Sequence, residues 1–356
     1  MLNRLLSHDL PRNRWLALLL LAILLALAFT PFIFPGTKAL NVAAKIIVFI
    51  VLAASFDLLL GYTGIVSFAH TMFFGIGAYG IAIASTRLGG GWGAIALGLA
   101  AALALSTLLS VLIGLFSLRV RAIFFAMITL AVASAFLTLA SQLSDFTGGE
   151  DGLTFKVPEA LRPGTPYLAD AFLGATIDGR FVTYYGLFFA ALVLVLLLIR
   201  IVNSPFGRVL QAIRENDFRA EAIGYRTVVY RTLASVLSAL FATLAGVLLA
   251  LWLRYNGPDT TLSFEIMLDV LLIVVIGGMG TVYGAVIGSV LLVLAQNYLQ
   301  DLMKLGATAT DGVPVLAQLI LPDRWLLWLG ILFVLSVYHF PAGVVGRLRA
   351  MRKPKP

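Results

Sequence analysis

Few side chains in this 356-residue chain have the types and spacing that chemistry requires. The chain contains no Cys, which excludes disulfides, thiolate metal sites and a Cys nucleophile. Its three His residues, His8, His70 and His339, are too widely spaced to indicate a His-based metal site. An enzyme would need a convergent set of polar groups, and the sequence offers only scattered ones. We therefore expect no catalytic residue and no metal site.

The acidic residues that stand in apolar sequence are the remaining candidates for chemistry. Asp57 and Asp269, together with His70, are the groups that would move protons or ions in an ion-coupled secondary transporter. Glu265 and Asp269 are four residues apart and so share one helix face. The helix dipole alone accounts for Glu265, with a gain of about 0.3–1 kcal/mol. Asp269 lies deeper in the apolar stretch, so we expect a polar environment or a partner for it.

A first glycine-rich break interrupts the apolar sequence at Gly61-Tyr62-Thr63-Gly64 and is followed by Ser67 and His70. Unwound backbone at membrane depth is tolerated only where it is buried in protein or lines a wet cavity. Tyr62, Thr63, Ser67 and His70 are therefore candidates to line a translocation path. The alternative is a tight turn in which Ser67 and His70 bond to neighbouring helices. Gly75, Gly77 and Gly80, further along, favour close helix packing.

A second break, at Gly277-Gly278-Met279-Gly280, occupies a similar position late in the chain. Asp269, Gly277, Gly278 and Gly280 complete the candidate path. Gly280, Gly284 and Gly288 recur every four residues, which predicts one helix face of small residues for close packing. Paired breaks in two halves are typical of a transporter with an internal repeat. The chain contains no P-loop pattern, so we expect any nucleotide to be bound by another chain.

The composition predicts that most of the chain lies in a bilayer. Apolar residues make up 61% of the sequence and charged residues 12%, whereas soluble domains carry about 25% charged residues. A membrane-spanning helix needs about 20 apolar residues. Ten segments meet that requirement, and if either glycine-rich break is re-entrant the number becomes eight or nine. The ten lie near residues 15–34, 42–60, 65–86, 93–117, 122–141, 182–201, 232–253, 263–280, 284–301 and 324–343.

The charges predict which side each loop lies on. Ten spans that start inside place both termini, residues 118–121 and the loop 202–231 in the cytoplasm, and the loop 142–181 in the periplasm. Most Lys and Arg residues, Arg119 and Arg121 among them, then lie inside, as the positive-inside bias requires. This asymmetry explains the net charge of +8 without nucleic-acid binding. We expect one all-α membrane domain over residues 1–356.

The inner loop has the pattern of an exposed amphipathic helix over residues 205–225. Pro205 and Gly207 end the preceding span, helix formers follow, and Gly224 is placed to end the run. Leu210, Ile213, Phe218 and Ile223 supply apolar contacts between charged residues. The alternative is a basic segment that touches anionic lipid. Three acids among the arginines favour a protein surface instead.

These motifs, in this order, resemble the branched-chain amino-acid ABC importer permeases. The segment with Arg214, Glu215, Asn216, Arg219, Glu221, Ala222 and Gly224 resembles the coupling loop of that family. Gly61–Gly64 with Ser67 and His70 is similar to its early signature, and Gly277–Thr281 with Gly284 to its late one. Thr147–Leu153 resembles an outer-loop motif of the longer of two sister permeases. The resemblance runs from about residue 40 to the C-terminus, and the outer loop after Leu153 departs from it.

The resemblance implies a permease of the bacterial inner membrane that pairs with a sister permease and does no covalent chemistry. Two cytoplasmic ATPase subunits, with their own ATP and Mg²⁺, would dock on the two coupling loops, and a periplasmic binding protein would deliver substrate. In this chain the docking residues would be Arg214, Glu215, Asn216, Arg219, Glu221, Ala222 and Gly224. Related permeases for urea and short amides are the nearest alternative. An ion-coupled secondary transporter is a further one, and it would need no docking loop.

Overall fold

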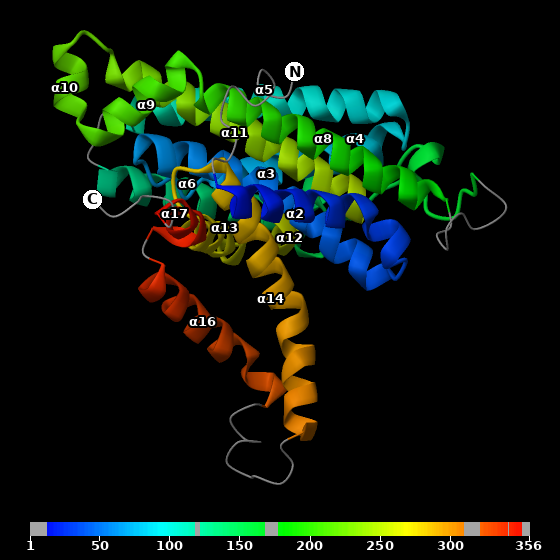
Figure 1. The fold of residues 1–356 in the computed structure, drawn as a ribbon. Coiled ribbons are helices and arrows are strands. Elements are labelled where there is room, and N and C mark those ends of the chain that lie inside the picture. Colours follow the sequence, from blue (N-terminus) through cyan, green and yellow to red (C-terminus); the bar gives the residue numbers. More distant parts are fainter. Residues whose placement is uncertain (1–12, 118–121, 168–176, 310–320, 341, 351–356) are drawn as a thin grey trace.

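Long apolar helices account for most of the chain in the computed structural model (Figure 1). The structure describes residues 13–117, 122–167, 177–309, 321–340 and 342–350. Several expected features lie outside the described residues. They are the two chain ends, which we expect in the cytoplasm, the inner loop with Arg119 and Arg121, and part of the expected outer loop 142–181. The long helices are α2 (Arg14–Ile33), α3 (Thr37–Thr63), α4 (His70–Leu88), α5 (Trp92–Ser117), α6 (Ala122–Gln142), α8 (Gly179–Val202), α11 (Thr227–Leu253), α13 (Phe264–Gly277), α14 (Val282–Ala309) and α16 (Trp325–His339).

Nine helical stretches in the described residues are long and apolar enough to cross a membrane, within the expected range of eight to ten. The tenth expected segment, near 65–86, corresponds to α4. This helix has 19 residues, and His70, several glycines and Arg87 leave it short of the apolar composition of the nine stretches. α13 reaches spanning length only together with the short α12 (Pro258–Thr261) that precedes it. The all-α membrane fold is thus confirmed.

Helices α3, α4 and α11 form the centre of the molecule, because small residues let them approach closely. α3 is almost wholly enclosed by protein, and α4 packs along both α11 and α5. A side chain on Gly77 would collide with the carbonyl oxygen of Thr243 on α11, and one on Gly246 with that of Phe74 on α4. Such contacts drive helix association in lipid, where the hydrophobic effect does not. The packing role predicted for the α4 glycines is confirmed.

The outer helices expose apolar side chains, as lipid contact requires. α2, α5, α6 and α16 bury only a small part of their length. In Figure 1, α14 and α16 project together from the main group of helices. The chain then returns through α17 (Gly343–Ala350), which contacts α13 and α14. Gly343 lies against Gly278, so this last helix covers the second glycine-rich break.

The loop after α6 is a folded cap. It contains α7 (Ser144–Thr147), the 3-10 turns Gly149–Asp151 and Glu159–Leu161, and strand β1 (Leu153–Thr154). β1 pairs antiparallel with β2 (Tyr255–Asn256), with Leu153 opposite Asn256. Gly152 has a φ of 70° and lies against the backbone of Asn256. The predicted outer-loop motif, Thr147–Leu153, therefore packs against the segment that follows α11.

Candidate functional site

The loop expected to dock ATPase subunits forms two short helices, α9 (Pro205–Glu215) and α10 (Asp217–Ala222). Sequence reasoning predicted a single helix here, and that was wrong. Asn216 breaks it because its backbone is extended and its side chain caps α10, accepting from the backbone N–H of Arg219 at 2.9 Å. Gly224, with a φ of 96°, ends the run as predicted.

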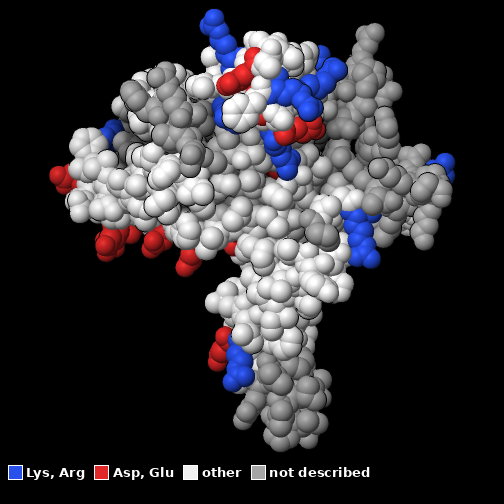
Figure 2. Space-filling model, turned by 90° about the vertical axis from the view of Figure 1, so that its left-hand side faces the viewer, with Lys and Arg blue, Asp and Glu red and all other residues white. Residues whose placement is uncertain are grey.

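Both helices bury one face and present another to solvent. Leu210, Ile213 and Ala220 are buried against the long helices, whereas Phe218 is 87% exposed and Ile223 67% exposed. Sequence reasoning treated all four apolar residues alike as suppliers of apolar contacts, and the structure buries Leu210 and Ile213 but exposes Phe218 and Ile223. Figure 2 faces this end of the molecule and shows Lys and Arg side chains, with acids among them, gathered over α9 and α10. The predicted docking residues Glu215, Arg219, Glu221, Ala222 and Gly224 are exposed on this surface.

Contacts to the start of α11 hold α9 and α10 in place. Asp217 pairs with Arg231 at 3.0 Å, and the Oγ1 of Thr227 donates to the Oε1 of Glu221 at 2.7 Å. The ring of Phe206 stacks on that of Tyr230 with centroids 5.8 Å apart. A force on the exposed surface would therefore reach α11 directly.

Arg214 links α9 to both glycine-rich breaks. Its Nη1 donates to the carbonyl oxygen of Gly61, and it lies against Gly64 and Gly280. The backbone N–H of Gly280 donates to the Oδ1 of Asp57 at 2.8 Å. A side chain on Gly61 would collide with both Asp57 and Gly280, so only glycine fits there. We call Gly61, Gly64, Gly278 and Gly280 the glycine junction.

The glycine junction lies at the α9 end of the molecule, where α3 ends and α14 begins. Of the residues predicted to line a path, Gly277, Gly278 and Gly280 lie in or beside it. Gly280 precedes α14, so the predicted helix face of Gly280, Gly284 and Gly288 was wrong in its first member. Gly284 and Gly288 do pack closely, against Gly278 and against the backbone of Ile273.

The polar residues around the first break are buried beside the junction. Tyr62, Thr63 and Ser67 are each at most 5% exposed, and the Oγ1 of Thr63 donates to the carbonyl oxygen of Leu59 at 2.6 Å. His70 is 1% exposed, and its Nε2 lies 2.8 Å from the Oγ of Ser55 on α3. The Oγ of Ser238 on α11 donates to the carbonyl oxygen of Ser55 at 2.6 Å, so this contact ties together α3, α4 and α11.

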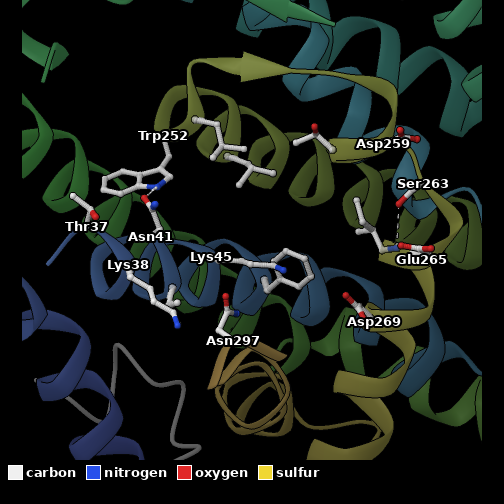
Figure 3. Close-up of a pocket in the computed structure, with 16 residues that line it drawn as sticks. Thr37, Lys38, Asn41, Lys45, Trp252, Asp259, Ser263, Glu265, Asp269 and Asn297 are labelled. Atoms are coloured by element: carbon white, nitrogen blue, oxygen red, sulfur yellow. Dashed lines mark hydrogen bonds between the residues drawn. The ribbon is translucent and has the colours of Figure 1, made fainter. Parts of the chain in front are cut away.

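Asp269 lies apart from these residues, in a pocket beside the start of α3 (Figure 3). α9 lies at the other end of α3, where Arg214 meets Gly64. The pocket has a volume of about 670 Å³ and is bounded by α3, α11, α12, α13 and α14. As predicted, Asp269 has a polar partner, since its Oδ1 accepts from the Nε2 of Gln296 at 2.8 Å. Sequence reasoning missed Lys38, Asn41 and Lys45, which also line the pocket. Their spacing of three and four residues on α3 was the available signal.

The described residues contain no group of three or more His, Cys, Asp or Glu side chains placed to hold a metal ion.

The family model for "Branched-chain amino acid transport system / permease component" matches residues 38–337. The chain belongs to this permease family. It is 28% identical over 325 residues to the high-affinity branched-chain amino acid transport system permease protein LivM of Escherichia coli, covering 87% of this chain and 74% of that one. For LivM of Salmonella typhimurium the identity is 27% over 324 residues, with the same coverage. A probable LivM of Methanocaldococcus jannaschii is 28% identical over 218 residues, which are 61% of this chain and 58% of that one. No solved structure matches.

Membership makes this permease a multi-pass membrane subunit of an ABC importer. Its family is one of transport components, and an inner-membrane location fits it. The match spans nearly all the described helices, from the start of α3 to the end of α16.

Proposed function

We propose that this permease forms half of the translocation path of an ATP-driven importer for branched-chain amino acids and docks an ATPase subunit through residues 205–225. The observation that carries the proposal is the exposed surface of α9 and α10. Phe218 and Ile223 are 87% and 67% exposed there, among charges of both signs. Large apolar side chains at the centre of a polar rim are typical of a protein interface.

The same surface supports the orientation. Arg208, Arg214, Arg219 and Arg226 are exposed at the α9 end, which suits the cytoplasmic side. The pocket that contains Asp269 then opens toward the periplasm, where a substrate-binding protein would deliver its cargo. ATP and Mg²⁺ would be bound by the partner ATPase subunits, because the chain has no P-loop pattern.

The contacts of α9 suggest how ATPase closure would act on the path. Movement of α9 would shift Arg214, and Arg214 holds the carbonyl oxygen of Gly61. Gly61 contacts Gly280, whose N–H bonds Asp57, so the ends of α3, α13 and α14 would move together. A hinge built on glycine backbone has no side chains to repack. The sister permease would complete the other half of the path.

Purification of the chain from detergent-solubilised membranes, with mass spectrometry of what accompanies it, tests this proposal. We expect ATPase subunits and a second permease to be present. The variant Phe218→Ser should lose the ATPase subunits, whereas Phe146→Ser, a matched change of an aromatic residue that is 56% exposed on the outer loop, should keep them. Recovery of the chain alone, with uptake that collapses when the proton gradient is dissipated, would instead support a secondary transporter.

A further inference from the structure

The pocket around Asp269 carries opposite charges on opposite walls. Lys38 and Lys45 line the α3 wall, while Asp259, Glu265 and Asp269 line the wall formed by α12 and α13 (Figure 3). Lys38 already forms a salt bridge with Asp301 of α14 at 2.5 Å. Lys45 and Asp269 form no salt bridge with any described residue. Asp259 and Glu265 also form no salt bridge with any described residue, so Lys45 and three acids line the pocket without a charged group at salt-bridge distance.

The carboxamide of Gln296 spans the gap between Lys45 and Asp269. The Oε1 of Gln296 lies 3.5 Å from the Nζ of Lys45, and its Nε2 donates to the Oδ1 of Asp269 at 2.8 Å. Gln296 thus offers an acceptor to the ammonium and a donor to the carboxylate. A small molecule with a carboxylate and an ammonium on neighbouring carbon atoms has the same polarity, but with full charges.

The two asparagines of the pocket add one donor and one acceptor. The Oδ1 of Asn41 accepts from Arg180 at 3.0 Å and from Trp252 at 3.2 Å, which leaves its amide N–H groups for a ligand. The Nδ2 of Asn297 donates to the carbonyl oxygen of Val293 at 2.8 Å, which leaves its Oδ1. Donors therefore lie on α3, with Lys45 and Asn41, and acceptors lie on α13 and α14, with Asp269 and Asn297.

Apart from Thr37, Thr260 and Ser263, the rest of the lining is apolar. Val42, Phe49, Leu249, Trp252 and Ile266 provide a surface that suits an aliphatic side chain. The Nζ of Lys45 lies 5.3 Å from the centroid of the Phe49 ring, so the charged and apolar parts of the pocket adjoin. A volume of about 670 Å³ is within the range of ligand pockets, roughly 300–1,000 Å³.

From these observations we infer that the pocket is a binding site for a zwitterionic aliphatic α-amino acid on its way through the membrane. Lys45 and Asn41 bind the carboxylate, Asp269 and Asn297 bind the ammonium, and Trp252 and its apolar neighbours contact the side chain. A neutral urea or amide would offer neither a full negative charge to Lys45 nor a full positive charge to Asp269. This inference rests on the proposed function, which gives the permease an amino acid to carry.

The test uses the complete complex reconstituted in liposomes with its substrate-binding protein, and measures L-leucine uptake per ATP hydrolysed. Lys45→Gln and Asp269→Asn should each lower uptake by about tenfold to a hundredfold, the range for one charge-assisted hydrogen bond, while ATP hydrolysis continues. Lys156→Gln and Asp145→Asn make the same charge changes on exposed residues outside the pocket and should leave uptake unchanged.

A second measurement locates the ligand directly. A diazirine analogue of L-leucine, photolysed during turnover of the wild-type complex, should label peptides that contain residues 41–49 and 249–253. Labelling only elsewhere in the chain would overturn the inference, and this readout decides the matter if a variant fails to assemble. If Lys45→Gln and Asp269→Asn both take up leucine at the wild-type rate, the pocket assignment alone is overturned. A wild-type complex that takes up no leucine would overturn the proposed function itself.

Discussion

Replacing Arg214 should uncouple ATP hydrolysis from transport while leaving the ATPase subunits docked. In the structure this side chain is the direct bond between α9 and the glycine junction, through the carbonyl oxygen of Gly61. A hydrogen bond from a charged group contributes about 1.5–3 kcal/mol. Because Arg214 is partly exposed, we expect Arg214→Ala to cost about 1.5 kcal/mol, near the lower end of that range.

The same free energy sets the expected loss of function. If the bond exists in one state of the transport cycle and not in another, its loss changes the ratio of those states by about tenfold. Leucine uptake per ATP hydrolysed in reconstituted liposomes should therefore fall by about that factor. Arg214→Lys should recover part of it, since an ammonium can still donate to Gly61.

The matched control is Arg226→Ala, which removes the same charge from an exposed position on the same loop, just outside the docking segment 205–225. We expect that variant to transport normally. Equal losses in both variants would mean that only the charge of the loop matters. Normal coupling in Arg214→Ala would refute the mechanical link through Gly61.

Three further changes test the packing. Gly61→Ala should prevent stable assembly because its methyl group collides with Asp57 and Gly280, whereas Gly36→Ala, where nothing lies within 4 Å, should express normally. Asp57→Ala should lower the thermal stability of the purified complex by about 1–3 kcal/mol, and Asp57→Asn by less, because an amide oxygen can still accept from Gly280; equal losses would contradict the assigned bond. Asp217→Asn should cost at most about 1 kcal/mol in chemical denaturation, because the pair with Arg231 is partly solvated and is only one of several contacts that hold α10; a larger loss would contradict this.

The spans were predictable because lipid imposes a length and an apolar composition that can be read locally. Helix ends marked by glycine, such as Gly64 and Gly224, were also predictable, since their left-handed backbone requires it. α4 was predicted as a span near 65–86, although it falls short of the apolar composition of the nine spanning stretches; contacts with α3 and α11 stabilise its polar residues.

Contacts between distant residues could not be predicted. Gly61 and Gly280 each appeared in a break, but nothing in either segment shows that they touch or that Arg214 joins them. The break at Asn216 was missed because an Asn inside a helical pattern can either continue the helix or cap a new one, and the sequence alone does not show which. The pocket was missed because Lys45 reads as one charge inside a span until Asp269, from the other half of the chain, faces it.

Site-specific crosslinking tests the central claim, that α9 and α10 dock an ATPase subunit. The chain has no Cys, so a single introduced thiol gives an unambiguous position. Phe218→Cys and Ile223→Cys, treated with a short thiol-directed crosslinker in native membranes, should each form an adduct with an ATPase subunit, and Phe146→Cys on the outer loop should not. Adducts from Phe146→Cys, or none from either α10 position while the ATPase subunits still co-purify, would contradict the account.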